Sequence, residues 1–146
     1  MHLAIGSDHA GFPLKQAIIH YLQEQGIQFE DFGCYDQTRV DYPDYAYKVA
    51  KAISSKTHTP GIVICGTGIG VSIVANKVRG VRAALCCSEY MAEMARRHND
   101  ANILAMGGRT TTPEMAIRIL NIFLNTDFEG GRHALRVEKI TSLTDR

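Results

Sequence analysis

The sequence predicts an α/β fold in which a five-stranded parallel sheet carries helices on both faces, a three-layer α/β/α sandwich. Three observations lead to this prediction. Short apolar runs alternate five times with amphipathic segments, the pattern of parallel strands joined by crossover helices. One run, "GIVIC" (61–65), is apolar at every position, as in a strand that is buried on both faces. The 146 residues, 45% of them hydrophobic, are enough for one substantial core.

The first half of the chain contains three strands and three helices. "HLAIGS" (2–7) is expected to be a strand, and the helix that follows over 13–26 ends at Gly26. "IQFEDFG" (27–33) is the second expected strand. Pro43 suits the first turn of a helix, so the next helix is placed at 44–54. After the strand at 61–65 and a glycine loop, "VSIVANKV" (71–78) is expected to be helical.

The second half repeats the alternation twice. Strands are expected at 81–87 and 102–107, helices at 89–98 and 113–125, and a last helix at about 131–143. The sequence contains no internal repeat, low-complexity segment or linker. Residues 1–146 are therefore expected to form a single domain of the Rossmann-like kind.

Composition excludes several classes of protein. A net charge of +1, with 21% charged residues, does not suggest a nucleic-acid-binding surface. No apolar run approaches the roughly 20 residues that span a bilayer, and the first apolar run is too short for a signal peptide. We therefore expect a cytoplasmic protein with no membrane or nucleic-acid partner.

The four cysteines form neither a C-x-x-C pair nor a spacing typical of zinc ligands. Cys86 and Cys87 are adjacent, which disfavours a disulfide between them. We expect four reduced thiols, with Cys34, Cys86 and Cys87 as small core residues.

In a sheet of this kind, ligands bind beyond the carboxyl ends of the strands. Three polar or glycine-rich segments follow strands one, three and five: Gly6-Ser7-Asp8-His9, Cys65-Gly66-Thr67 and Gly107-Gly108-Arg109. The sequence therefore predicts that these loops meet at one edge of the sheet.

The segment "ICGTGIGVS" (64–72) is the most informative of them. It lacks the Lys-Ser/Thr ending of a P-loop and the G-x-G-x-x-G spacing of a dinucleotide site. A phosphate cradle, an oxyanion site and a purely structural turn all remain compatible with it. Cys65 stands at a strand end before a helix N-terminus, where backbone N–H groups stabilise a thiolate that acts as nucleophile or base. The alternative is a buried, inert cysteine.

Other candidate side chains have structural alternatives as well. Asp8 and His9 could position a hydroxyl or bind phosphate, or Asp8 could simply be a cap. His98 could be an acid or base, or only a partner of a helix C-terminus. Arg132 and Arg136 are four residues apart on one helix face, which suits a phosphate monoester, although surface charge would give the same pattern.

Five segments together resemble the ribose-5-phosphate isomerase B family and its galactose-6-phosphate isomerase relatives. They are "GSDHAGFPLK", "DYPDYA", "ICGTGIGVSIVANK", "RRHNDANILAMGGR" and "EGGRHALRVEKI", and they span nearly the whole chain in the expected order. The resemblance implies an enzyme that interconverts D-ribose 5-phosphate and D-ribulose 5-phosphate through a cis-enediolate. It also implies that no metal or organic cofactor is needed. The expected assembly is a homodimer, or a dimer of dimers, with its sites between subunits.

The resemblance also implies a role for individual residues. Cys65 matches the general base, and the backbone of Gly66, Thr67, Gly68, Ile69 and Gly70 matches the anion hole for the enediolate. Thr67 and His98 match residues that open the furanose ring, with His98 as the proton donor. The remaining matches bind substrate: Asp8, His9 and Asn99 at the sugar, Tyr42 beside the ring, and Arg109, Arg132 and Arg136 at the phosphate.

One branch of the family places a glutamate base where this chain has Val71 and has glycine where Cys65 stands, so the chain resembles the cysteine branch. Two alternatives stay open at this point. One is an isomerase of a 6-phosphohexose, such as allose 6-phosphate or galactose 6-phosphate. The other is a non-catalytic module that binds phosphosugars.

Overall fold

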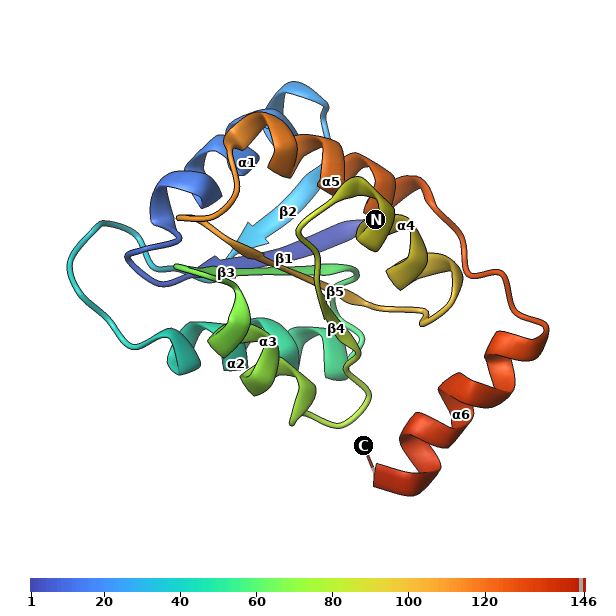
Figure 1. Ribbon diagram of the computed structural model, residues 1–146. Helices are drawn as coiled ribbons and strands as arrows, with labels where there is room; N and C mark the ends of the chain where they lie inside the picture. Colours follow the sequence, from blue (N-terminus) through green and yellow to red (C-terminus); the bar gives the residue numbers. More distant parts are fainter. Residues whose placement is uncertain (145) are drawn as a thin grey trace.

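The computed structural model describes residues 1–144 and 146 and arranges them in three layers (Figure 1). The central sheet consists of β1 (His2–Ser7), β2 (Gln28–Asp31), β3 (Gly61–Cys65), β4 (Ala83–Leu85) and β5 (Ile103–Gly107). Neighbouring strands are all parallel, in the order β2-β1-β3-β5-β4. The predicted fold class, a five-stranded parallel sheet between helices in one domain, is confirmed.

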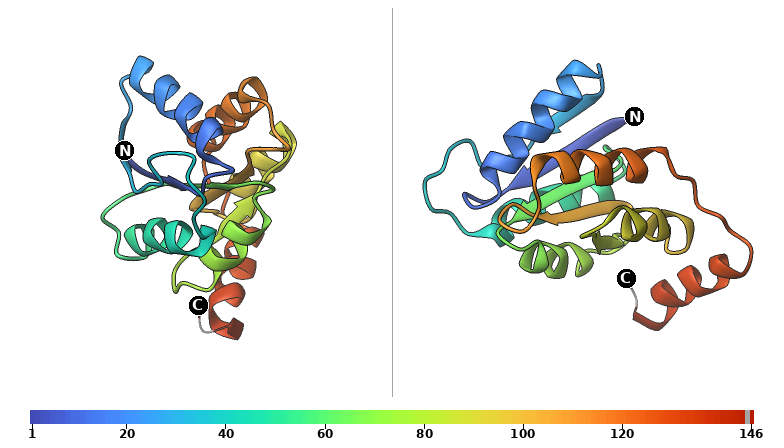
Figure 2. Two further views of the ribbon diagram at one scale, coloured as in Figure 1. Left: turned by 90° about the vertical axis from the view of Figure 1, so that its left-hand side faces the viewer. Right: turned by 45° about the horizontal axis from the view of Figure 1, so that its top comes forward.

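Helices cover both faces of the sheet (Figures 1 and 2). One face carries α1 (Phe12–Glu24), α4 (Glu89–Arg97) and α5 (Pro113–Asn125), and the other carries α2 (Tyr42–Ser54) and α3 (Ile69–Asn76). The last helix, α6 (Arg132–Thr144), belongs to neither layer and projects from the side of the domain. Among the described residues, no helix has both the length and the apolar character needed to cross a bilayer.

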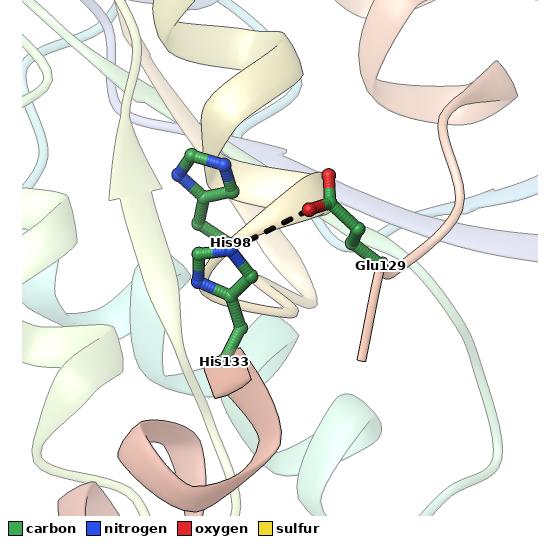
Figure 3. A group of neighbouring side chains, drawn as sticks. All are labelled: His98, Glu129 and His133. Carbon is green, nitrogen blue, oxygen red and sulfur yellow. Dashed lines mark ion pairs between the residues drawn. The ribbon is translucent and has the colours of Figure 1, made fainter. Parts of the chain in front are cut away.

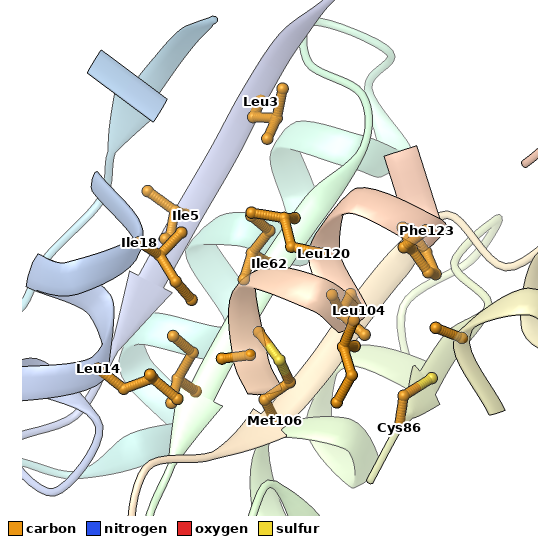
Figure 4. Packing of buried hydrophobic residues seen from close by; sticks show 14 of the residues in the cluster. Leu3, Ile5, Leu14, Ile18, Ile62, Cys86, Leu104, Met106, Leu120 and Phe123 are labelled. Atoms are coloured by element: carbon orange, nitrogen blue, oxygen red, sulfur yellow. The ribbon is translucent and has the colours of Figure 1, made fainter. Parts of the chain in front are cut away.

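The strands divide their buried side chains between two cores, because successive residues of a strand point to opposite faces. In β3, Ile62 and Ile64 pack towards α1, α4 and α5, whereas Val63 and Cys65 pack towards α2 and α3. Figure 4 shows the first core, which contains large side chains such as Phe123 and Met106. The second is built mainly of alanine and valine. Cys65 is therefore held by its strand against the α2–α3 layer.

Several element bounds differ from the sequence prediction: β2 is shorter than 27–33, α2 begins at Tyr42 rather than at 44, and β4 and α3 differ as follows. β4 covers Ala83–Leu85 rather than 81–87; at its amino end the Arg82 N–H donates to the side chain of Asn102 (2.8 Å) instead of to a neighbouring strand. α3 begins at Ile69 rather than 71. Gly68 adopts a left-handed conformation (φ 81°), which glycine accepts without strain, and this turn starts the helix two residues earlier.

The strand order places the reversal point of the sheet between β1 and β3. From this pair the sheet extends to β2 on one side and to β5 and β4 on the other. In open α/β sheets the crevice outside such a point is the usual place for a ligand. The segment after β1 lies directly against the end of β3, since a Cβ at Gly11 would stand 2.6 Å from the carbonyl oxygen of Ile64.

Candidate active site

The loops that follow β1, β3 and β5 meet at the carboxyl edge of the sheet. Backbone hydrogen bonds join them: the Gly108 N–H donates to the Cys65 carbonyl (2.8 Å), and the Arg109 N–H donates to the Gly66 carbonyl (2.9 Å). The Asp8 N–H donates to the carbonyl of Ile64 (3.2 Å). The predicted convergence of the three loops is therefore present, and the backbone holds it.

The thiol of Cys65 lies at the mouth of the glycine loop. Its residue is only 6% exposed, and its Sγ accepts a hydrogen bond from the Gly68 N–H (3.2 Å) at the N-terminus of α3. A second hydrogen bond lies in the same loop: the exposed Thr67 hydroxyl accepts from the Ile69 N–H (3.3 Å). An N–H donor and the positive end of a helix dipole both stabilise negative charge on sulfur. This arrangement suits a sulfur that accepts and returns a proton.

The other three cysteines have different surroundings. Burial raises the pKa of the Cys86 thiol to about 12, with the neighbouring Cys87 acting in the same direction, so Cys86 stays protonated at neutral pH. Cys34 is buried, and its Sγ hydrogen bonds to the Asp36 carbonyl. Cys87 is exposed, so its predicted place in the core is wrong. β4 ends at Leu85, and Cys87 follows two residues later in the turn before α4.

Asp8 and His9 both have structural partners at this edge. One carboxylate oxygen of the buried Asp8 accepts from the Gly11 N–H (2.9 Å) and so holds the turn before α1, but the N-cap of α1 is Gly11, which receives no side-chain cap. His9 Nδ1 accepts from the Val40 N–H (3.2 Å). A neutral His9 ring therefore carries its proton on Nε2, which leaves that nitrogen as a donor.

Tyr42 and Arg109 flank the glycine loop from either side. The ring of Tyr42, at the start of α2, lies so close to Gly70 that a Cβ there would collide with it. The guanidinium of the exposed Arg109 lies beside Gly66, where a Cβ would stand 3.5 Å from Nη1. The carboxyl edge thus combines a thiol, backbone donors, a phenol and one cation.

The remaining predicted site residues do not lie at the carboxyl edge of the sheet. His98 caps the end of α4, Asn99 follows it, and Arg132 and Arg136 are exposed on α6. Figure 1 shows α6 and the end of α4 on the side of the domain opposite to the glycine loop. A helix that follows a parallel strand runs back along it, so its end returns to the amino edge. Applied to His98, at the end of a predicted helix, this rule could have predicted from the sequence alone that His98 and Cys65 lie at opposite edges of the sheet.

A side chain that the sequence analysis did not select connects this second group. The ring of His133, in the first turn of α6, stacks on the ring of His98 with centroids 4.1 Å apart and planes inclined by 10° (Figure 3). His133 Nε2 also lies 3.6 Å from Glu129 Oε1. The sequence does contain a feature that could have pointed to His133: this histidine stands between the two candidate arginines in the segment "RHALR".

The same three residues come close to a metal-ligand set. One ligand atom each from His98, Glu129 and His133 lie within 4.8 Å of one another. The lone pair of an imidazole nitrogen lies in the plane of its ring, however. Two nearly parallel stacked rings cannot both direct such lone pairs at one ion. The observed geometry therefore describes a stacked pair of rings rather than a metal centre.

Within one chain, the structure brings together the residues of the carboxyl edge and keeps the others apart from them. The first group, the thiol group, consists of Asp8, His9, Tyr42, Cys65, Gly66, Thr67, Gly68, Ile69, Gly70 and Arg109. The second, the histidine–arginine group, consists of His98, Asn99, Arg132, Arg136 and the newly found His133. Within a single chain, therefore, the two groups do not form one site in this structure.

Comparison with known proteins gives a consistent result. The family described as Ribose/Galactose Isomerase matches residues 3–140. Ribose-5-phosphate isomerase B of Escherichia coli is 46% identical over 144 residues, which cover 99% of this chain and 97% of that protein. The solved structure of Clostridium thermocellum ribose-5-phosphate isomerase B is 50% identical with a TM-score of 0.98, and the match covers 99% and 98% of the two chains. A protein named D-erythrulose-4-phosphate isomerase, from Pectobacterium atrosepticum, is 47% identical over 96% of this chain and 93% of its own length.

Proposed function

The chain belongs to the ribose/galactose isomerase family, and from this premise we propose that it interconverts D-ribose 5-phosphate and D-ribulose 5-phosphate. The observation that carries the proposal is Cys65 Sγ, which accepts the Gly68 N–H at the carboxyl edge of the sheet (3.2 Å). An aldose–ketose isomerase needs a base that returns the proton it removes, next to donors for an oxyanion. This edge offers both.

The reaction moves one carbon-bound proton. The Cys65 thiolate removes the proton from C2 of the open-chain aldose, and negative charge spreads over O1 and O2 of the cis-enediolate. Backbone N–H groups between Gly66 and Gly70 stabilise that charge. The Cys65 thiol then returns the proton to C1, while the hydroxyl proton passes from O2 to O1. The aldehyde becomes a hydroxymethyl group and C2 becomes the ketone, so no electron acceptor from outside is needed.

The other residues bind the substrate and open its ring. His98 donates a proton to the ring oxygen and Thr67 assists the opening. Asp8, His9 and Asn99 bind sugar hydroxyls, and Tyr42 lies beside the ring. Arg109, Arg132 and Arg136 bind the phosphate, for which guanidinium groups offer paired donors.

The active unit in this proposal is a homodimer. The thiol group of one chain is completed by the histidine–arginine group of its partner, which agrees with their separation within a chain. α6 supports the same assembly. It packs little against its own domain and exposes Leu135, Ile140 and Leu143, the last of them 81% exposed. Exposed apolar side chains that gather on one element are typical of an interface.

A substrate panel tests the proposed activity. We expect kcat/KM to be higher for ribose 5-phosphate than for allose 6-phosphate or galactose 6-phosphate. Erythrose 4-phosphate belongs in the panel because a relative of nearly the same identity bears the name of a four-carbon isomerase. A higher value for any of these sugars would assign the chain to that substrate instead. Phosphosugar binding without turnover of any of them would favour the non-catalytic module.

A further inference from the structure

His133 is a buried imidazole that the proposed mechanism does not use. It is 4% exposed, and its Nε2 has no hydrogen-bond partner among the residues that the structure describes. One face of its ring is covered by the ring of His98, as Figure 3 shows. The stack lies between the end of α4 and the first turn of α6.

A second contact holds the two elements together at the same place. The Glu129 N–H donates to the Arg97 carbonyl (3.0 Å), and Glu129 Oε2 accepts from Arg97 Nε (3.0 Å). Arg97 directly precedes His98 in the chain. Glu129 Oε1 points towards His133 Nε2 (3.6 Å). The last turn of α4 and the first turn of α6 are thus tied through Glu129, with the stacked rings beside the tie.

The ring of His98 has few other restraints. It is only partly buried, and no hydrogen bond to either of its ring nitrogens occurs among the described residues. Stacking restrains the tilt of the ring but leaves both nitrogens at its edge free to exchange protons. A general acid must hold its donor nitrogen within hydrogen-bond reach of the accepting oxygen. The stack is the contact that fixes the plane of this ring.

We propose that His133 is a positioning residue for the opening of the sugar ring, because its imidazole holds the ring of His98 in the orientation from which it donates its proton. This inference rests on the proposed function. Burial lowers the pKa of His133, and charge on His98 and on Arg132 acts in the same direction. Only Glu129 acts in the opposite direction, so His133 is neutral at neutral pH and the stack does not set two cations face to face.

Two substitutions separate the stack from other roles of the side chain. His133→Ala removes the ring, whereas His133→Phe keeps a planar ring of similar size and loses both nitrogens. For ribose 5-phosphate, we expect His133→Ala to lower kcat by about tenfold or more with KM changed by less than about threefold. His133→Phe should recover most of that loss. Equal losses in the two variants, or full activity of His133→Ala, would overturn the proposal.

A second readout bypasses ring opening. Ribulose 5-phosphate has no furanose form, because its only hydroxyl able to close such a ring carries the phosphate. Exchange of its C1 proton with deuterated solvent therefore needs Cys65 but not His98. We expect His133→Ala to keep this exchange while it loses turnover of ribose 5-phosphate. Parallel loss of both would show that His133 supports only the fold, and thermal melting of each variant checks that directly.

The pair can also be tested for coupling. If His133 acts through His98, adding His133→Ala to His98→Asn should lower ribose 5-phosphate turnover no further than His98→Asn alone. Independent, additive losses would contradict the proposal. Failure of the proposed function gives a different result, since the unmodified protein would then show neither turnover of ribose 5-phosphate nor exchange on ribulose 5-phosphate.

Discussion

At the residue scale, the four thiols of this chain have different surroundings, and these surroundings decide which of them can react. Cys65 receives an N–H from Gly68, Cys86 is buried with a pKa raised to about 12, and Cys87 is exposed. Reactivity follows the thiolate and access to it. Only Cys65 combines a donor to its sulfur with a place at the carboxyl edge.

Removing this sulfur should stop the proton transfer and leave binding nearly intact. We expect Cys65→Ala to lower exchange of the C2 proton of ribose 5-phosphate by about 10²-fold or more, because a general base contributes at least that much. Substrate affinity should stay within a few fold. Cys87→Ala is the matched control and should exchange as the unmodified protein does. Exchange near the normal rate in Cys65→Ala would remove the cysteine from the mechanism.

Alkylation gives an independent measure of the same assignment. In a Cys87→Ala background, iodoacetamide should inactivate the enzyme by modifying Cys65, and ribose 5-phosphate should protect it. Cys86 should remain unmodified near pH 8, because a thiol with a pKa of about 12 is almost entirely protonated there. Mass spectrometry of the inactivated protein locates the label. A label on Cys86 that tracks the loss of activity would contradict the prediction.

At the scale of elements, the start of α3 combines backbone conformation with proposed chemistry. Gly68 has φ 81°, and a Cβ there would stand 2.5 Å from Leu85 Cδ1 and 2.8 Å from the Met106 carbonyl carbon. We expect Gly68→Ala to lower kcat by about 10²-fold or more, the usual cost of disturbing an oxyanion site. The loop must also shift, so the melting temperature should fall.

Gly26→Ala is the control for this prediction. Gly26 also has a positive φ (66°), but a Cβ there would meet nothing within 4 Å. It should therefore show only the strain of a left-handed alanine, about 1 kcal/mol, with kcat unchanged. A folded Gly68→Ala protein with normal kcat and weakened binding of inorganic phosphate would show that the loop is a phosphate cradle.

The contact between α4 and α6 should make stability depend on pH. Burial, with charge on His98 and Arg132, lowers the pKa of His133 in the folded protein. An unfolded histidine has a pKa of about 6.5, so below that pH the unfolded state binds the proton first and the folded state loses stability. This loss ends once the pH falls below the pKa of folded His133.

The measurement is thermal melting of three proteins at about pH 7.5 and about pH 5.5, the two sides of the unfolded pKa. The loss of melting temperature on acidification should be smaller in His133→Phe than in the unmodified protein. His20→Gln is the control, because His20 is exposed and forms an ion pair with the exposed Glu24 of the same helix. It should keep the full loss. An unchanged loss in His133→Phe would show that His133 titrates equally in both states.

At the scale of the whole molecule, the proposed dimer can be tested by mixing inactive chains. In a mixed dimer of Cys65→Ala and Arg136→Ala, one site has both residues intact and the other lacks both. Random exchange of subunits should therefore restore about a quarter of the normal activity. Activity is measured after the two proteins are partly unfolded together and refolded.

A second mixture serves as the control. Cys65 and Arg109 belong to the same group of one chain, so no mixed dimer of Cys65→Ala and Arg109→Ala contains an intact site. That mixture should be no more active than Arg109→Ala alone. If the first mixture also stayed as inactive as the control, α6 would serve the site of its own chain.

From the sequence alone, the order of helices and strands in the three-layer fold and the residues of the thiol group could be predicted. The alternation of strands and helices follows from local periodicity, and α5 begins where Thr112 and Pro113 indicate, with the Thr112 hydroxyl accepting from the Met115 N–H (3.2 Å). The meeting of Asp8, Cys65 and Arg109 follows from the parallel sheet alone, because each residue stands at or just beyond the carboxyl end of its strand.

Only the tertiary structure decided the strand order, the exposure of Cys87 and the separation of His98 and the α6 arginines from Cys65. Strand order depends on pairing between apolar segments that are far apart in the chain and nearly equivalent in composition. The place of α6 is not set by a crossover rule, because it does not connect two of the described strands. Its position comes from the contact of His133 with His98 and of Glu129 with Arg97. Such contacts join residues more than thirty positions apart, and their geometry exists only once both helices are in place.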